Sequence, residues 1–131
     1  MTYTLALNGA IADSEVPALR KSIGWGGRQQ DYPQLFELCN FYAGIREDVT
    51  GQLVAFGYVC GMGLEHGYIE DIIVHPEHQK KGLGKKLIQA LIKESRRQKI
   101  GILTLSTDED TAAFYQACGF DLEVSGVMFL D

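Results

Sequence analysis

A long amphipathic helix that follows an apolar strand constrains this chain more than any other feature. The strand is expected over residues 67–76, GYIEDIIVHP, and Pro76 ends it because proline cannot donate to a strand ladder. The helix is expected from Leu83 to Arg97, with lysine, glutamine and arginine on its outer face. Its inward stripe consists of Leu83, Leu87, Ile88, Leu91, Ile92 and Ser95. This succession predicts a chain that mixes strands with helices.

Further elements are predicted on either side of this pair. Strands are expected over residues 2–8, over the two arms of 45–62 about a turn at Thr50-Gly51, over 101–106 as a buried strand, and over 127–130. The resulting order of elements indicates an α/β (α+β) fold in a single domain over residues 1–131, without repeats or linkers.

Three shorter helices complete the predicted order. They are expected over residues 13–24, 32–44 and 108–120. Within the second of these helices, Leu38 and Tyr42 belong to one inward face because they are spaced as successive turns of a helix.

The composition is that of a globular protein. Apolar residues make up 46% and charged residues 22% of the 131 residues, which argues against disorder. The start, MTYTLALNGA, lacks the basic residues and the apolar run of a signal peptide, and no stretch is long enough to span a bilayer. The three cysteines, Cys39, Cys60 and Cys118, are an odd number without a close pair and indicate reduced thiols. We therefore expect a cytoplasmic protein.

Positive charge gathers around the start of the long helix, although the whole chain has a formal net charge of −5. From Lys80 to Lys99 there are eight Lys or Arg and one Glu, and Lys80, Lys81, Lys85 and Lys86 flank two glycines. Because a helix N-terminus is itself partly positive, lysines there suggest a missing negative ligand. A solvated helix face and a nucleic-acid patch are the general alternatives. Since the chain is acidic and shows no nucleic-acid-binding motif, a compact polyanion fits best.

The loop that carries these lysines fits one phosphate-binding pattern and fails two others. A GxxxxGK[ST] loop would need glycine at 79 and Ser or Thr at 86, and a dinucleotide GxGxxG loop would need glycine at 87. The chain has Gln79, Lys86 and Leu87 at these positions, and the six residues from Gln79 to Gly84 read QxxGxG. Free amides at a helix start bind anions, and glycine lets them approach. A tight turn without a ligand is the alternative.

The QxxGxG pattern at this strand-to-helix junction resembles the acetyl-CoA signature of the GNAT superfamily of N-acetyltransferases, [QR]xxGx[GA]. The similarity extends over roughly residues 52–120, where YIEDIIVHPEHQKKGLGKKLI, the next strand and AAFYQACGF keep the family's order. The first 50 residues match only in having two helices after a strand. The resemblance implies a GNAT-like fold, with a twisted mixed β-sheet flanked by helices on both faces, and acetyl-CoA as co-substrate.

The resemblance also implies where CoA binds. Its pyrophosphate would lie on the amides of the loop from Lys80 to Lys85, and its pantetheine arm would pair with the backbone of residues 72–74. Asp108 matches a position that touches this arm, but it is often Asn in the family, and a helix N-cap role is an equal alternative. The implied CoA-binding residues are Ile72, Ile73, Val74, Gln79, Lys80, Lys81, Gly82, Leu83, Gly84, Lys85, Asp108 and Phe114.

Two residues are candidates for the proton transfers of amine acetylation. Tyr115 matches the tyrosine of the family's FYxxxGF segment, which implies a general acid for the CoA thiolate; a helix tyrosine facing water is the alternative. Glu70 and Asp71 interrupt an apolar strand, and strand alternation places them on opposite faces, Glu70 with Ile72 and Asp71 with Ile73. The pair resembles the Glu-Asp of polyamine acetyltransferases, which implies Glu70 as base through water, unless water acts alone. Asp71 would bind the substrate ammonium or serve as a structural hydrogen bonder.

The remaining features complete the expected function. Trp25 lies in the region that lines the acceptor site in the family, and a core tryptophan is the equal alternative. His75 and His78 have no third ligand, so no metal is expected. No nucleophile motif occurs, so we expect a small-molecule primary amine to attack acetyl-CoA directly. A protein lysine or N-terminal acetyltransferase and a non-catalytic acyl-CoA-binding module are the alternatives. The expected partners are acetyl-CoA and an amine, without nucleic acid or membrane, and a homodimer is left open.

Overall fold

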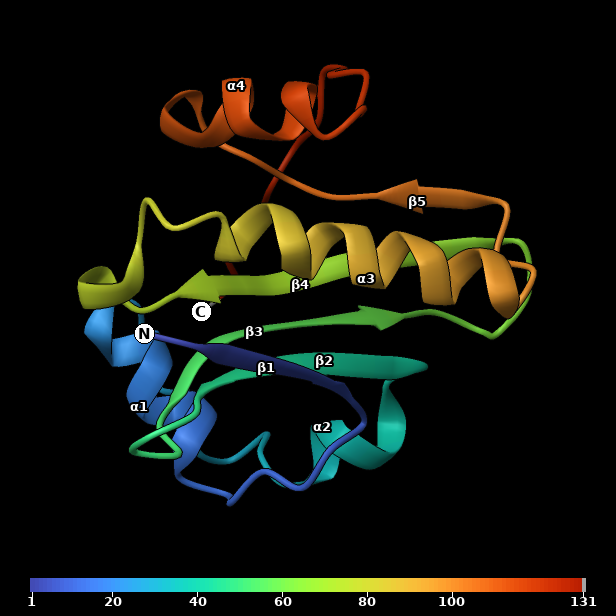
Figure 1. The fold of residues 1–131 in the computed structure, drawn as a ribbon. Helices are drawn as coiled ribbons and strands as arrows, with labels where there is room; N and C mark the ends of the chain where they lie inside the picture. The colour runs from blue at the N-terminus through green and yellow to red at the C-terminus, as the bar shows by residue number, and fades with distance from the viewer. Residues whose placement is uncertain (131) are drawn as a thin grey trace.

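Within residues 1–130, five strands form one mixed sheet, and helices cover both of its faces (Figure 1). The computed structural model describes residues 1–130. The strands are β1 Tyr3–Leu7, β2 Phe41–Glu47, β3 Leu53–Cys60, β4 His66–Val74 and β5 Ile102–Thr104, and they lie side by side in that order. Neighbouring strands are antiparallel except β4 and β5, which run parallel. This arrangement confirms the predicted mixed sheet.

The helices are α1 Glu15–Ser22, α2 Gln34–Leu38, α3 Leu83–Arg97 and α4 Glu109–Ala117, with a 3₁₀ turn, η1 Pro76–His78, before α3. The bounds of α3 agree with the prediction, and its inward stripe is buried apart from the half-buried Ile92. Within residues 1–130, none of the helices is both long and apolar enough to cross a membrane.

Two apolar cores lie on the two faces of the sheet. On one face, Leu87 and Leu91 of α3 pack against Val59 of β3 and its neighbours. On the other face, the α1 side chain of Leu19 and its neighbours pack against Phe56 of β3. Because β3 contributes to both cores, almost its whole length is buried. The sheet is therefore held from both sides around β3 and β4, the strands that carry the predicted site.

The second predicted helix is shorter than expected. α2 ends at Leu38, Cys39 is extended, and Tyr42 already belongs to β2, where it pairs with Tyr58. Leu38, which we predicted to face inward, is 78% exposed. The helical spacing was misleading because a five-residue helix has little stability of its own, whereas β2 gains a full ladder with β3.

Two predictions near the C-terminus were also wrong. β5 is a partly exposed edge strand rather than a buried one, because it pairs with only three residues of β4 and then diverges. Residues 127–130 are not a strand, and their apolar side chains are largely exposed. An apolar run forms a strand only where another strand offers backbone partners, and within residues 1–130 this segment has none.

The core beside β5 leaves no room for a side chain at Gly67. A Cβ there would lie 2.9 Å from Val59 Cγ1 and 3.1 Å from both Ile100 Cγ2 and Leu103 Cδ2. We expect Gly67→Ala to lower the free energy of unfolding by about 1–3 kcal/mol, because these packed side chains must shift. Gly26→Ala is the control, since nothing lies within 4 Å of its Cβ. Equal urea unfolding curves for the two variants would contradict this packing.

Candidate active site

A β-bulge in β4 determines the geometry of the site. Phe56 of β3 pairs with Ile73, and Tyr58 pairs with Glu70, so three residues of β3 lie opposite four residues of β4. Asp71, inside the bulge, has a left-handed φ of 52°. A non-glycine residue keeps this conformation where surrounding contacts hold it, and bulges are frequent beside active sites.

The bulge shows that the predicted facing of the two carboxylates was wrong. The extra residue turns both toward the α1 and α2 side of the sheet, where Glu70 contacts Tyr58 and Asp71 contacts Arg20. Ile72, which we had placed beside Glu70, packs on the α3 side. Strict alternation of side chains applies only to an unbroken ladder, and the bulge interrupts it.

Three donors hold the Asp71 carboxylate. Arg20 of α1 donates to Oδ1, while Arg28 Nη1 and Tyr32 Oη donate to Oδ2 at 3.1 and 2.8 Å. The Asp71 side chain is only 7% exposed, so these donors offset the cost of burying its charge. Burial, and next the Asp71 charge, raise the pKa of Tyr32 far above its usual value, so its hydroxyl stays a donor. This geometry favours the structural role predicted for Asp71 over binding of an ammonium group.

Glu70 is adjacent to Asp71 but has a single hydrogen-bond donor among residues 1–130. Tyr58 Oη donates to Glu70 Oε2 at 2.6 Å and accepts from Arg28 Nη1 at 3.2 Å. Burial, and next the hydrogen bond to Glu70, raise the pKa of Tyr58 well above its usual value. Tyr58 therefore keeps its proton, and a hydrogen-bonded chain from Arg28 through Tyr58 orients Glu70. The other carboxylate oxygen of Glu70 remains available to a ligand.

A cleft of about 450 Å³ opens beside β4. β5 pairs only with the first three residues of β4, so among residues 1–130 the second half of β4 has no strand on that side. In Figure 1, β5 and α4 lie beyond β4 at the top of the molecule. The predicted site residues that line this cleft are Trp25, Glu70, Asp71, Ile72, Asp108 and Tyr115. The structure thus brings the predicted base and the predicted acid to one cavity.

Tyr115 reaches the cleft from α4. Its side chain is 8% exposed, and its ring packs edge-on against Phe114 and Phe120. Burial raises the pKa of Tyr115 to about 12, with smaller contributions from Cys118 and Asp108. The phenol therefore keeps its proton at neutral pH and can act there as an acid. The Tyr115 ring is buried, but its hydroxyl has no hydrogen-bond partner among residues 1–130, so its role as the general acid stays a prediction.

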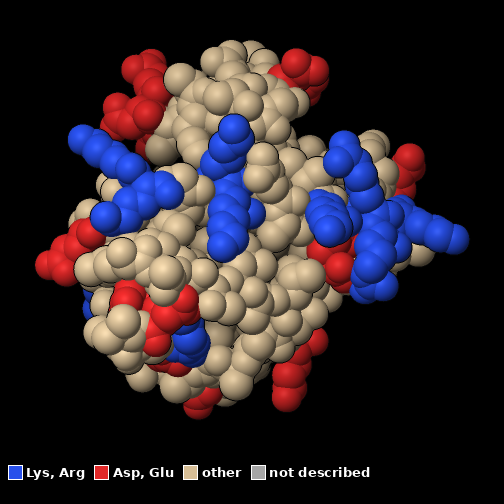
Figure 2. Space-filling view, viewed as in Figure 1, with Lys and Arg blue, Asp and Glu red and all other residues tan. Residues whose placement is uncertain are grey.

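The predicted glycine loop is present at the start of α3. Gly82 is the N-cap with φ 78°, and Lys86 N–H is the first amide of the helix to donate back, to the Gly82 carbonyl. The amides of residues 83–85 therefore lack intrahelical acceptors. A Cβ at Gly82 would meet nothing within 4 Å, so the backbone is open to a ligand. Figure 2 shows Lys and Arg side chains gathered on this face, over α3.

Several predicted CoA-binding residues help to build this loop. Gln79 Nε2 donates to the Val74 carbonyl at 3.0 Å and so ties the loop to β4. The Leu83 side chain is buried in the core, which leaves only its amide for a ligand. Phe114 of α4 packs over Gly84, where a Cβ would lie 3.2 Å from Phe114 Cζ. The loop, β4 and α4 are thus in direct contact.

The structure shows the positions of Asp108 and Trp25, and contact of either residue with a ligand stays a prediction. Asp108 is the N-cap of α4, and its Oδ1 accepts from the Thr111 N–H at 3.0 Å. The Thr111 hydroxyl and amide lower the pKa of Asp108. Trp25 is not a core residue, since it is exposed at the cleft with the Arg20 guanidinium 5.1 Å from its ring centroid.

The residues His75, Glu77 and His78 are close enough to hold a metal ion, with ligand atoms within 4.8 Å of one another. One nitrogen of each histidine already has a partner, because His75 Nδ1 accepts from the Glu77 N–H and His78 Nδ1 bonds Tyr3 Oη. These bonds stabilise the turn η1, and none of the three residues lines the cleft. The absence of a metal stays a prediction.

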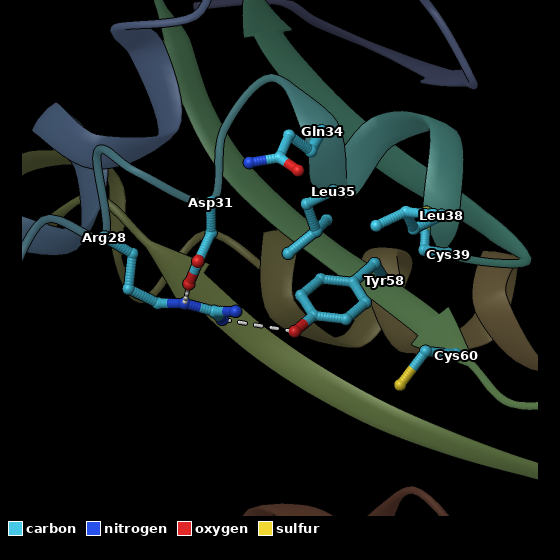
Figure 3. Close-up of a pocket in the computed structure, with 8 residues that line it drawn as sticks. All are labelled: Arg28, Asp31, Gln34, Leu35, Leu38, Cys39, Tyr58 and Cys60. Carbon is cyan, nitrogen blue, oxygen red and sulfur yellow. Dashed lines mark hydrogen bonds and ion pairs between the residues drawn. The ribbon is translucent and has the colours of Figure 1, made fainter.

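A second cavity, of about 270 Å³, lies between α2 and β3 (Figure 3). Tyr58 lies between this cavity and the cleft, because its ring lines this cavity and its hydroxyl donates to Glu70 in the cleft wall. The lining residues are Arg28, Asp31, Gln34, Leu35, Leu38, Cys39, Tyr58 and Cys60. Sequence reasoning missed Arg28 and Tyr58, since an arginine in a loop and a tyrosine in an apolar strand have no motif to mark them.

Comparison with known proteins shows which proteins this chain is similar to. Residues 11–120 match the family model described as the acetyltransferase (GNAT) family. The chain is 33% identical over 82 residues to the uncharacterized N-acetyltransferase ycf52 of Pyropia yezoensis, a match that covers 63% of this chain and 47% of that protein. It is 38% identical over 53 residues to glucosamine 6-phosphate N-acetyltransferase of Schizosaccharomyces pombe, covering 40% of this chain and 48% of that protein. The chain thus spans about half the length of the curated relatives it matches.

A solved structure shows the same fold over the full chain. The glucosamine-6-phosphate N-acetyltransferase of Arabidopsis thaliana superposes with a TM-score of 0.83 over 100% of both chains. The sequences are 20% identical, so this likeness concerns the fold alone.

Removal of the Asp71 carboxylate tests its structural role. We expect Asp71→Asn to lower the free energy of unfolding by about 3–5 kcal/mol, because a broken buried pair leaves arginine charge uncompensated. Asp31→Asn is the matched control, since Asp31 also pairs with Arg28, at 2.7 Å, but is 51% exposed. Its loss should cost less than about 1 kcal/mol. Similar losses for both variants in chemical denaturation would show that Asp71 does not hold the bulge.

Proposed function

Because the chain belongs to the GNAT family of acetyltransferases, we propose that it transfers the acetyl group of acetyl-CoA to the primary amine of a small molecule. One observation carries the proposal: Glu70 of β4 and Tyr115 of α4 line a single cleft. Acetylation of an amine needs a base that accepts the ammonium proton and an acid that protonates the leaving thiolate. The cleft offers one group suited to each task.

Acetyl-CoA fits along the free edge of β4, with its pyrophosphate at the start of α3. In the described part of the chain, residues 72–74 have no strand neighbour on that side, which supports their predicted pairing with the pantetheine arm. The amides of residues 83–85, the open space over Gly82 and the exposed Lys80, Lys81 and Lys85 support the pyrophosphate site. When bound, acetyl-CoA supplies the activated acyl group.

The two candidate catalytic groups divide the proton transfers. A primary ammonium with a pKa near ~10.4 must lose a proton at neutral pH, which costs roughly 4–5 kcal/mol. Glu70 accepts that proton, directly or through a water molecule. The amine nitrogen then bonds to the acyl carbon as the carbon–sulfur bond breaks, and Tyr115 gives its proton to the sulfur. The second proton of the amine restores the phenol, directly or through solvent.

Direct attack is favoured over a covalent intermediate. Of the described residues that line the cleft, none is a cysteine, so no thiol nucleophile stands beside Glu70. One similar protein is named glucosamine 6-phosphate N-acetyltransferase, which supports a small amine as acceptor. Trp25 would form part of the acceptor side of the cleft. The cytoplasmic location and the homodimer stay predictions.

Acetyl-CoA should raise the melting temperature of the protein, whereas ATP and NADH at the same concentration should not. At 100 times Kd, a ligand stabilises the folded state by about 2.7 kcal/mol. Gly82→Val should abolish this shift, because a β-branched side chain would cover the free amides. Gly51→Val is the matched control, since Gly51 also has a positive φ, 74°, and open space around its Cβ. Equal shifts in both variants would place the phosphates elsewhere.

Tyr115→Phe should lower kcat by about 10²–10⁴-fold while the Kd for acetyl-CoA stays near that of the wild type, because only the proton donor is lost. The pKa of Tyr115 is raised to about 12, so the wild type should keep the acid throughout the ordinary assay range. Activity that depends on the phenol should be lost only as the pH rises toward that value. Tyr42→Phe is the control, since Tyr42 is equally buried, at 8% exposed, but its hydroxyl bonds Gly9. A Tyr115→Phe variant with normal turnover would show that solvent protonates the thiolate.

A further inference from the structure

We propose that the acceptor is a small primary monoamine with an apolar body, and that this body lies in the cavity between α2 and β3 (Figure 3). The proposal rests on the proposed function and names its substrate class. Three properties of the cavity support it: the contact of its wall with Glu70 through Tyr58, the chemistry of its wall and its size.

The cavity adjoins the candidate base. The Tyr58 ring forms part of its wall, and the Tyr58 hydroxyl donates to Glu70 Oε2 at 2.6 Å. We place the ligand along this ring, with one end beside the Tyr58 hydroxyl, the part of the wall nearest to Glu70. The amine nitrogen belongs at that end, and the body of the molecule lies between α2 and β3.

Much of the cavity wall is apolar. Figure 3 shows Leu35, Leu38 and Cys39 from the α2 side, with Cys60 at the end of β3. Burial raises the pKa of the Cys39 thiol to about 11 and also raises that of Cys60. Both thiols are therefore neutral at physiological pH, and a neutral buried thiol behaves as a small apolar group. This part of the wall favours a hydrocarbon body.

The charged side chains of the wall are already paired. Arg28 Nε donates to Asp31 at 2.7 Å, and Arg28 Nη1 donates to Tyr58 and Asp71. A phosphate or carboxylate on the ligand would have to compete with Asp31 and Asp71 for Arg28. A second ammonium would have to compete with Arg28 for Asp31. Glu70 lacks an ion-pair partner among residues 1–130, so one positive charge near Glu70 is the best match.

The volume favours a small ligand. The cavity measures about 270 Å³, near the lower end of ligand pockets, which span about 300–1,000 Å³. An aryl-alkyl amine such as phenethylamine has the required shape, with one ammonium group, a short stem and an apolar ring.

A panel of three amines tests the substrate class. Phenethylamine has the proposed chemistry, spermidine adds ammonium groups, and glucosamine 6-phosphate adds a phosphate and hydroxyls. We expect kcat/KM for phenethylamine to exceed that of the others by about tenfold or more, because unpaired charge and polar groups fit the wall poorly. A higher kcat/KM for spermidine or glucosamine 6-phosphate would overturn the substrate class and leave the proposed function intact.

Thiol alkylation measures occupancy of the cavity without turnover. With CoA present, phenethylamine should slow the reaction of Cys39 and Cys60 with iodoacetamide, read by mass spectrometry of their peptides. Cys118, on the segment after α4, is the control within the same molecule and should react at an unchanged rate. Protection without acetylation of any amine would support the ligand class and contradict the proposed function. Equal labelling with and without phenethylamine would overturn the cavity as its site.

A narrowed cavity gives a further test. Cys60→Leu places a larger side chain on the wall and should raise KM for phenethylamine by about tenfold, which is typical of lost room for a methylene group. The Kd for acetyl-CoA should not change. Val49→Leu is the control, since it places a leucine at the exposed turn between β2 and β3, outside both cavities. An unchanged KM in folded Cys60→Leu would contradict the proposal, and the alkylation test decides if that variant does not fold.

Discussion

The buried carboxylate of Asp71 is the contact on which the geometry of the site depends. It accepts from Arg20 of α1 and from Arg28 and Tyr32 of the segment before α2, and so ties the N-terminal region to the middle of β4. These contacts hold a left-handed residue in a strand, which has a cost of its own. In return, the bulge places Glu70 on the same face as Asp71, and one carboxylate oxygen of Glu70 stays available to a ligand.

The same stretch of β4 connects the fold to the proposed chemistry. On one side β4 pairs with β3, and on the other its second half is free because β5 diverges. The lysine-rich start of α3 lies at the end of this free edge, and α4 brings Tyr115 to the cleft beside it. The positive charge that is unusual at a helix N-terminus therefore lies where the proposed phosphates would bind. Each feature is ordinary alone, and together they make up the proposed acetyl-CoA site.

The sequence predicted the parts of the structure that depend on local pattern. The bounds of α3, the glycine loop and the helix that carries Tyr115 follow from spacing and caps within short segments. The bulge at Asp71 could not be predicted from alternation, because the partner strand decides where a ladder is interrupted. The inward position predicted for Leu38 was wrong for a related reason, since the pairing of β2 with β3 ended the helix early. Arg28 and Tyr58 act only through neighbours that are distant in sequence, so no local signal marked them.

Dependence of thiol release from acetyl-CoA on an amine tests the proposed acetyl transfer. We expect release that rises with the concentration of a primary amine, yields the acetylated amine in equal amount, and falls strongly in Glu70→Gln while acetyl-CoA still binds. Tight binding of acetyl-CoA with no thiol release on any amine would contradict it, because a cleft with a working base and acid must turn over. That result would identify a module that binds acyl-CoA without catalysis.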